Sequence, residues 1–317
     1  MQTHYLLGLD GGGTKTDALL CTADGEVKAR CTAGPSSLTG QSEESAFLQI
    51  RTVLTGVLSP VGGLDAPIAG FYAGISGGGL EENRQKFRAL FRRLLSGLEH
   101  WDCGSDSVNA LSAGIGCEDG IIAIAGTGSS VFGRKQGAMR QVGGWGYLLG
   151  DEGSGFDLGR RALTAALRAL DGRGEPTLLK DLCETHAACA LRELVARIYQ
   201  RNSKAEIASF APVLLRAARQ NDAAALAELE ASAGEMAHAI RCARRFCGSA
   251  NVVLGGSVWQ DPSYRAAVER LLGQEYTLIT PRFPPVYGSV TLAAALAGFS
   301  CGEAFRQRIE ETIGRVN

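Results

Sequence analysis

A carboxylate followed by three consecutive glycines is the feature of this sequence with the clearest chemical potential. Asp10 ends an apolar run, and the residues after it are Gly11, Gly12, Gly13, Thr14 and Lys15. Backbone N–H groups without neighbouring side chains can close around phosphate oxygens, and an adjacent carboxylate can hold Mg²⁺ through water. A plain hairpin turn would also use glycine, but three in a row exceed what it needs. The pattern therefore favours a site for a metal-bound polyphosphate.

The pattern matches neither of the two common phosphate-binding motifs. A Walker P-loop requires Gly-Lys-Ser/Thr after a four-residue gap, and these glycines lack it. A dinucleotide fingerprint requires a helix after the turn, whereas residues 16–22 are typical of a strand.

A second glycine turn follows another apolar run. Its residues are Gly126, Thr127, Gly128 and Ser129. Alone, this turn is explained equally well by a tight connection between strands. Paired with the first, it offers a second set of free amides and two hydroxyls, so that two facing turns can hold a polyphosphate from both sides.

The elements around the two turns repeat. Apolar patterning and an Asp-Gly hairpin signal predict three antiparallel strands within residues 5–31, and the same arrangement returns within residues 120–142. In both groups the glycine turn joins the first strand to the second. An internal duplication of this kind implies two similar domains.

Most of the remaining chain is predicted to be helical. Helical spacing covers residues 43–58, 80–95 and 156–170, and residues 178–248 read as successive helices without a recognisable motif. We also expect strands at residues 66–75, 251–254 and 276–279 and a last helix at residues 290–297. Asp106 lies between a short strand and a helix predicted from residue 108. It is either a catalytic base or the N-cap, a role that Ser105 or Ser107 could equally fill.

Seven segments, in order along the chain, carry a resemblance to a known family. They are LGLDGGGTKTDALL (7–20), AGISGG (73–78), the Asp106 region, AIAGTGSS (123–130), GGWGYLLGDEGSG (143–155), DLGRRAL (157–163) and VVLGGSV (252–258). The sequence resembles the N-acetylglucosamine kinase family and the related BadF/BadG/BcrA/BcrD ATPase group of the sugar kinase/actin/Hsp70 superfamily. GGWG…GDEGS is the most specific of the motifs.

The resemblance implies an α/β fold of two duplicated ribonuclease H-like domains of the actin/hexokinase type. They would enclose an interdomain cleft, and the second would contain a helical insertion at residues 178–248. The expected domains are residues 1–115, with a C-terminal helix within 290–317 packing back on them, and residues 116–289. The family likeness also suggests a homodimer.

The activity implied by the resemblance is ATP-dependent phosphorylation of an amino sugar, N-acetylglucosamine first, at its 6-hydroxyl. Asp106 would be the base and Asp10 the Mg²⁺ ligand. The expected ATP-binding residues are Gly11, Gly12, Gly13, Thr14, Lys15, Gly126, Thr127, Gly128, Ser129, Gly255, Gly256 and Ser257. The expected sugar-binding residues are Ser37, Ser76, Asp106, Gly144, Trp145, Gly146, Asp151 and Glu152.

Three of these sugar residues have an alternative interpretation from sequence. Asp151 and Glu152 are flanked by glycines, so they could accept sugar hydroxyls or form an exposed acidic turn. Trp145 between two glycines could be a sugar platform or a core residue.

One departure from the family pattern leaves the sugar open. The family usually has an asparagine in the loop after the third strand, and this chain has none there. Ser37 is the residue expected to replace it. Glucosamine and N-acetylmuramic acid are therefore alternatives to N-acetylglucosamine.

Two rival functions follow from the same motifs. An ATPase that activates a 2-hydroxyacyl-CoA dehydratase or benzoyl-CoA reductase would share the phosphate turns and bind an iron–sulfur cluster, for which Cys103 and Cys117 are the candidates. A regulator without turnover would carry a DNA-binding helix-turn-helix before the first strands. The first strand starts at Tyr5, which leaves no room for one.

Composition excludes several other classes. Lys and Arg total 32 and Asp and Glu total 33, a balance that gives no support for a nucleic-acid partner. No apolar run reaches the roughly 18–20 residues that cross a bilayer. The residues from Met1 to His4 lack the basic region of a signal peptide. The nine cysteines contain no Cys-x-x-Cys pair, which is typical of reduced thiols. We therefore expect a cytoplasmic protein without a membrane partner.

Overall fold

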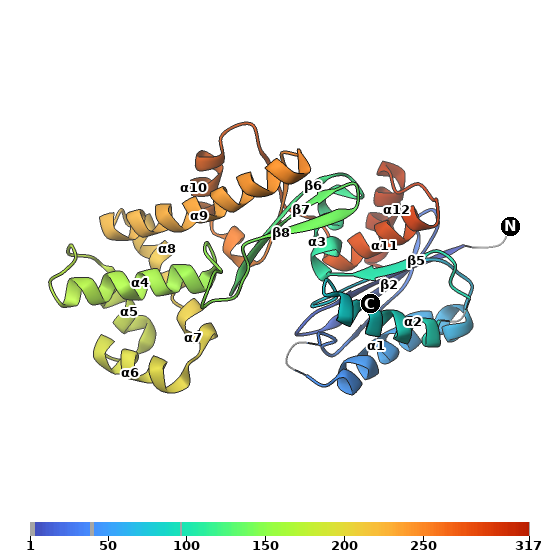
Figure 1. The fold of residues 1–317 in the computed structure, drawn as a ribbon, viewed down its shortest axis with the longest axis horizontal. Helices are drawn as coiled ribbons and strands as arrows, with labels where there is room; N and C mark the ends of the chain where they lie inside the picture. Colours follow the sequence, from blue (N-terminus) through green and yellow to red (C-terminus); the bar gives the residue numbers. More distant parts are fainter. Residues whose placement is uncertain (1–3, 39–40, 96, 317) are drawn as a thin grey trace. The chain divides into compact units, whose positions relative to one another are not determined.

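The computed structural model describes residues 4–38, 41–95 and 97–316 of the chain. Residues 1–3, at which we expected no signal peptide, and residue 317, at the end of the expected C-terminal helix, lie outside this part. The chain forms two compact units (Figure 1). Unit 1 comprises the residues up to Glu118 and those from Pro281 onward, and unit 2 comprises Asp119–Thr280.

Unit 1 is built on a five-stranded sheet. Its strands are β1 (Tyr5–Gly11), β2 (Thr16–Thr22), β3 (Val27–Ala33), β4 (Ile68–Ile75) and β5 (Trp101–Gly104). They lie in the order β3-β2-β1-β4-β5. The first three strands pair antiparallel, whereas β4 and β5 run parallel to β1. The carboxyl ends of β1, β4 and β5 therefore meet at one edge of the sheet.

Helices cover both faces of this sheet. They are α1 (Glu43–Leu58), α2 (Glu81–Leu94), α3 (Asp106–Ile115), α11 (Pro285–Leu296) and α12 (Glu303–Ile313), with two short 3₁₀ turns, η1 (Ser59–Val61) and η2 (Gly63–Asp65). Leu7 and Leu9 pack in one core with α1 and α2, whereas Leu6 packs in another with α11 and α12. Because successive strand residues point to opposite faces, β1 is apolar on both.

Unit 2 repeats this strand arrangement. Its strands are β6 (Gly120–Ala125), β7 (Ser129–Lys135), β8 (Ala138–Val142), β9 (Asn251–Gly255) and β10 (Thr277–Ile279). Their order, β8-β7-β6-β9-β10, is that of unit 1, with the same antiparallel and parallel pairings. The duplication predicted from the sequence is therefore confirmed.

The helices of unit 2 follow the glycine-rich loop. They are α4 (Gly155–Leu170), α5 (Leu179–Ala187), α6 (Leu191–Arg201), α7 (Lys204–Ala208), α8 (Ala211–Arg219), α9 (Ala223–Cys247) and α10 (Pro262–Leu272), with the 3₁₀ turn η3 (Ser257–Gln260). Helix α9 packs on β6, β7 and β8, while α4 packs on α5, α7, α8 and α9. No helix in the described part of the chain is long and apolar enough to span a membrane.

The chain returns to unit 1 earlier than the residue 290 that we expected. Helix α11 begins at Pro285, because proline is favoured in the first helical turn, where its missing N–H costs nothing. It also packs very closely on its neighbours. A Cβ on Gly8 of β1 would come within 2.6 Å of the Ser289 hydroxyl, and one on Gly288 would overlap the backbone oxygen of Asn109 in α3.

Candidate active site

The first glycine turn lies at the end of β1, where three loops of unit 1 converge. The Gly12 N–H donates to the Lys15 carbonyl at 2.9 Å, and the Gly12 carbonyl accepts from the N–H groups of Ser36 and Ser37 at 3.1 and 3.2 Å. The N–H of Ser76, directly after β4, donates to the Gly11 carbonyl at 2.7 Å. The structure thus brings Ser37 and Ser76 to the turn. Gly13, Thr14 and Lys15 are exposed.

Lys15 is engaged by a neighbouring carboxylate. Its ammonium lies 2.5 Å from Asp17, whose carboxylate also accepts a hydrogen bond from Thr32 and lies 3.3 Å from Arg30. Burial acts to raise the pKa of Asp17, but the hydrogen bonds from Lys15 and Thr32 dominate together and hold it below its usual value. The Lys15 side chain is 57% exposed, so its ammonium also faces solvent.

Asp106 is the first residue of α3, directly after β5. The N-cap is Ser105, whose hydroxyl oxygen accepts from the Ser107 N–H at 3.3 Å. One Asp106 carboxylate oxygen accepts from the Ser107 N–H at 3.0 Å and from the Ser105 hydroxyl at 3.1 Å. Burial raises the pKa of Asp106 above its usual value despite these bonds. Since Ser105 caps the helix, the N-cap alternative does not account for Asp106.

Asn109 is a site residue that the sequence analysis did not single out. Its side-chain amide donates to the Asp10 carboxylate at 2.7 Å and to the backbone oxygens of Leu9 and Gly74 at 3.1 and 3.2 Å. It therefore ties α3 to the ends of β1 and β4. Asn109 lies three residues after Asp106 and therefore on the same face of α3, and this spacing could have identified it from the sequence.

The carboxyl group of Asp10 ionises at a higher pH than that of an exposed aspartate. Burial raises its pKa to about 6, and the negative charges of Asp106 and Asp17 act in the same direction, whereas the hydrogen bond from Asn109 lowers it. Asp10 and Asp106 lie at the carboxyl ends of β1 and β5, and Asn109 of α3 connects the helix that begins with Asp106 to the Asp10 carboxylate. A cation beside Asp10 would lower its pKa, because an opposite charge stabilises the ionised carboxylate.

The second glycine turn, in unit 2, is bonded to the start of α4. The Gly126 carbonyl accepts from the Gly155 N–H at 2.7 Å, and the Thr127 carbonyl accepts from the Phe156 N–H at 3.2 Å. Ser129 is buried, and its hydroxyl donates to the Glu152 carbonyl at 2.6 Å. The Ser129 hydroxyl therefore supports the glycine-rich loop at residues 143–155.

That loop contains an exposed tryptophan. Trp145 is 69% exposed, which is incompatible with the core alternative. Gly144 and Gly146 have φ values of 70° and 88°, which favour glycine. A Cβ on Gly144 would also lie 2.6 Å from that of Ser130. A pocket of about 240 Å³ beside the loop is lined by Ser129, Ser130, Val131, Val142, Gly143, Gly144, Trp145, Leu149, Glu152, Glu235, Met236, His238 and Ala239.

The two adjacent acids of this loop have different environments. Asp151 is 4% exposed, has a φ of 60°, and lies 2.6 Å from the ammonium of Lys204. Glu152 is exposed and lines the pocket beside Trp145. The exposed acidic turn that we weighed from the sequence therefore describes Glu152 and not Asp151.

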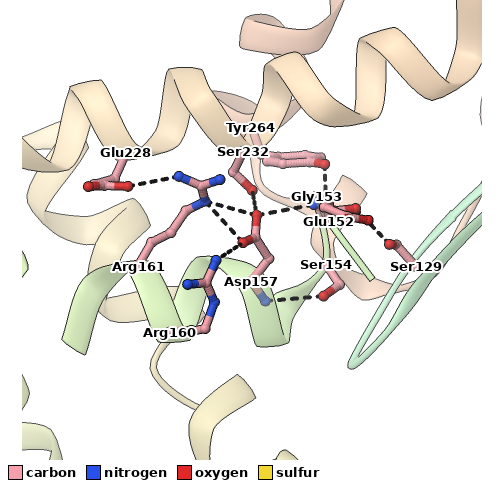
Figure 2. A network of polar contacts seen from close by, with 10 residues as sticks. All are labelled: Ser129, Glu152, Gly153, Ser154, Asp157, Arg160, Arg161, Glu228, Ser232 and Tyr264. Atoms are coloured by element: carbon pink, nitrogen blue, oxygen red, sulfur yellow. Dashed lines mark hydrogen bonds and ion pairs between the residues drawn. The ribbon is translucent and has the colours of Figure 1, made fainter. Parts of the chain in front are cut away.

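A buried carboxylate anchors the end of the loop, as Figure 2 shows. Asp157 accepts from the Gly153 N–H at 3.2 Å and from the Ser232 hydroxyl at 2.8 Å, and it forms ion pairs with Arg160 and Arg161. Burial acts to raise its pKa, but Ser232 and Arg161 together bring it below the usual value. The Asp157 carboxylate thus joins α4 and α9 to the loop.

Two hydroxyls complete this anchor. The Tyr264 hydroxyl donates to the Gly153 carbonyl at 2.7 Å, and the Ser154 hydroxyl oxygen accepts from the Asp157 N–H at 3.1 Å, which makes Ser154 the N-cap of α4. Both groups appear around Asp157 in Figure 2. The loop is therefore fixed at its carboxyl end before any ligand binds.

Loss of the Asp157 carboxylate is expected to destabilise the protein. In Asp157→Asn, Arg161 keeps its pairing with Glu228 at 2.9 Å but loses its buried partner. Breaking a buried ion pair is costly because an uncompensated charge remains, and we expect a loss of about 2–4 kcal/mol of unfolding free energy, measured by urea denaturation. Asp171→Asn, at an exposed carboxylate just after α4, is the control and should leave stability unchanged. Equal losses in both variants would contradict the anchoring role.

A second pocket in unit 2 joins the second turn to the helical stretch. It has a volume of about 380 Å³ and is lined by Thr127, Gly155, Ala205, Ala208, Ser209, Ala211, Pro212, Leu215, Ser257, Val258 and Asp261. The predicted residue Ser257 thus shares a pocket with Thr127. Gly256 has a φ of 95°, and a Cβ there would overlap the Ala125 carbonyl at the end of β6. The walls contributed by α7 and α8 were missed from the sequence, because residues 178–248 contain no recognisable motif.

The cysteines proposed for an iron–sulfur cluster are differently placed. Cys103 is buried in β5, where burial raises the pKa of its thiol to about 11, and Cys117 is exposed after α3. Cluster ligands are thiolates, so the buried neutral thiol of Cys103 does not favour such a site.

The comparisons with known proteins define the family. The model of the BadF/BadG/BcrA/BcrD ATPase family matches residues 7–293. The chain belongs to this family, as the sequence motifs indicated.

Individual relatives are also similar over most of the chain. An N-acetylmuramic acid/N-acetylglucosamine kinase of Clostridium acetobutylicum is 32% identical over 73% of this chain and 76% of its own length. An N-acetyl-D-glucosamine kinase of Dictyostelium discoideum is 28% identical over 70% of this chain and 73% of its own. A crystal structure from Chromobacterium violaceum, provisionally named an N-acetylglucosamine kinase, covers 92% of this chain and 99% of its own at 30% identity, with a TM-score of 0.69. The expected duplicated α/β fold is thereby confirmed.

Proposed function

We propose that this protein transfers the terminal phosphoryl group of ATP to the 6-hydroxyl of an amino sugar, N-acetylglucosamine first. The observation that carries the proposal is the repeat of one strand arrangement in both units, with a bare-backbone turn after the first strand of each. Asp10 and Asp106 lie at the sheet edge that bears the first turn. The named activities of the relatives from Clostridium acetobutylicum and Dictyostelium discoideum support the same reaction.

Phosphoryl transfer requires alignment, charge neutralisation and one group that accepts the hydroxyl proton. Asp106 is that acceptor in our proposal, because its raised pKa makes it a better base than an exposed aspartate. The backbone of residues 11–15 and 126–129 binds the phosphates. Gly255, Gly256 and Ser257 are proposed to bind the adenosine, and Ser257 lines the pocket to which Ala205, Ala208 and Ala211 contribute small side chains.

Asp10 fits the role of a magnesium ligand. Among the described residues, no cluster of three or more His, Cys, Asp or Glu side chains could hold a metal ion alone. Mg²⁺ in phosphotransfer sites is usually held by one or two carboxylates together with phosphates and waters, which is the set that a single Asp10 beside a phosphate turn would supply. The bound ion would neutralise phosphate charge.

The sugar-binding residues in this proposal remain Ser37, Ser76, Asp106, Gly144, Trp145, Gly146, Asp151 and Glu152. Exposed Trp145 offers an apolar face for a sugar ring. The relative from Clostridium acetobutylicum is named for both N-acetylmuramic acid and N-acetylglucosamine, so N-acetylmuramic acid is the second candidate substrate. The family resemblance further suggests a homodimer, and the cysteine pattern suggests the cytoplasm.

A sugar panel tests the function directly. The purified protein with Mg²⁺ and ATP is given N-acetylglucosamine, N-acetylmuramic acid, glucosamine or glucose, and release of ADP is followed. We expect the largest kcat/KM for N-acetylglucosamine, with a product phosphorylated at the 6-position by NMR. ADP release that no sugar accelerates would overturn the proposal and revive the ATPase-activator alternative.

A further inference from the structure

Lys204, in the helical stretch without sequence motifs, lies beside the second glycine turn. It is the first residue of α7, and its ammonium is 2.6 Å from the Asp151 carboxylate. A Cβ on Gly128 would lie 2.7 Å from that carboxylate and 2.8 Å from that ammonium. The two charged groups therefore lie directly beside the turn at Gly128, where no side chain separates them from the backbone.

The ammonium of Lys204 has donors to spare. It carries three N–H groups, and one of them serves Asp151. The side chain of Lys204 is 30% exposed, whereas that of Asp151 is only 6% exposed. The ammonium also lies 5.7 Å from the centre of the Tyr147 ring, a cation–π distance. The ion pair and the ring together fix the ammonium in place while part of it still faces solvent.

The next residues of α7 connect this ammonium to the proposed nucleotide pocket. Ala205 and Ala208 line the pocket that also contains Thr127 and Ser257. The Gly155 N–H holds the Gly126 carbonyl, so the start of α4 supports the same turn from its other side. A phosphate chain leaving this pocket along the turn would meet the Lys204 ammonium at Gly128.

We propose that Lys204 binds the phosphate chain of the nucleotide at the second turn and that Asp151 is its positioning residue. The inference rests on the proposed kinase function and adds a cation that the sequence motifs do not contain. A preorganised cation stabilises phosphate charge without losing side-chain freedom at the moment of binding.

Nucleotide binding without sugar tests the proposal. Dissociation constants for ADP and ATP with Mg²⁺ are measured by calorimetry, and that for adenosine by competition, for the wild type, Lys204→Met and Lys204→Gln. We expect both variants to bind ADP and ATP at least about tenfold more weakly, since tenfold corresponds to one lost charge-assisted contact. The dissociation constant for adenosine should change less than about twofold. The glutamine of Lys204→Gln can still donate a hydrogen bond to Asp151. This variant therefore allows the test if Lys204→Met does not fold.

Two further variants separate this role from a structural one. Lys180→Met removes a partly exposed lysine of the same helical stretch, which pairs with Asp181 and Glu184, and should leave all three constants unchanged. Asp151→Asn should weaken the binding of ADP about threefold to tenfold, because the Lys204 ammonium loses its ionised partner.

The outcomes distinguish this inference from the proposed function. If the wild type binds neither ADP nor ATP, both the proposed kinase function and the role of Lys204 are overturned. A wild type that binds ADP, with unchanged affinity in both Lys204 variants, overturns the lysine alone. A wild type that binds ADP, with unchanged ADP affinity in Asp151→Asn, overturns the positioning role of Asp151.

Discussion

Replacing Asp106 by asparagine is expected to lower kcat by about 10²–10⁴-fold, the usual contribution of general acid–base catalysis. Asparagine has nearly the same shape and can still accept the hydrogen bonds from Ser105 and Ser107. It cannot take the proton of the sugar hydroxyl. The dissociation constant for ATP should therefore stay within about threefold of the wild type. Steady-state kinetics with ADP release and calorimetry with ATP measure the two quantities.

Ser105→Ala is the matched control for the alternative that this position serves helix capping. It removes the N-cap hydroxyl of α3 and should cost about 1 kcal/mol of stability. Its kcat should remain near that of the wild type, because the Asp106 carboxylate keeps the bond from the Ser107 N–H. Near-normal turnover in Asp106→Asn would remove Asp106 from the base role, and a kcat loss in Ser105→Ala as large as in Asp106→Asn would assign the effect to α3 itself.

The pH dependence of the wild type provides an independent check on the same residue. The base must be ionised to accept a proton, and burial raises the pKa of Asp106. The kcat/KM should therefore fall as pH decreases through that raised pKa. An acid limb at the ordinary pKa of an exposed aspartate would contradict the partly buried environment of Asp106.

The parts of the site that were predictable from sequence are those whose chemistry is local. Gly11–Gly13 and Gly126–Gly128 are turns because of the residues they contain, and the strands that flank them follow from short-range apolar patterning. Their duplication needed only a comparison of the chain with itself. The sequence placed Asp106 just before a helix predicted from residue 108, whereas α3 begins at Asp106 itself, and it could not decide among Ser105, Asp106 and Ser107 as the cap.

The parts that were missed depend on residues far apart in the chain. Asp151 and Glu152 are neighbours in sequence, yet only Asp151 is buried, because Lys204 from α7 pairs with it. Asn109 reads as an ordinary helix residue until β1 and β4 bring two carbonyls and Asp10 to it. No spacing rule connects such partners, since their contacts are set by packing of the whole unit.

Asp10→Asn should remove activity and stabilise the metal-free protein. Loss of the proposed Mg²⁺ ligand is expected to lower kcat/KM at least about 10²-fold, since a metal contributes several kcal/mol to transition-state stabilisation. The stability effect follows from the pKa of Asp10, which burial raises from 3.8 to about 6. The folded state binds the proton more tightly than the unfolded state, so the cost of ionising Asp10 begins above the unfolded pKa of 3.8 and is complete above about 6. Asparagine removes that cost, which is about 3 kcal/mol at pH 7.5.

The sign of this effect can be separated from a general effect of removing charge, because Asp10 has a cross-strand partner of the same type. Asp17 pairs with Asp10 in the register of β1 and β2, but its pKa is lowered by Lys15 and Thr32 against the effect of burial. Its carboxylate therefore stabilises the fold above its unfolded pKa, and that stability is lost as pH falls through the lower folded pKa.

Asp17→Asn should destabilise the protein at pH 7.5, where Asp10→Asn stabilises it. At pH 5 the gain from Asp10→Asn should shrink, because the wild-type carboxyl is then mostly protonated, whereas the loss from Asp17→Asn should persist. Thermal unfolding of the metal-free variants at both pH values measures all four changes, and a shift of equal sign in the two variants would contradict the opposite environments of these two acids.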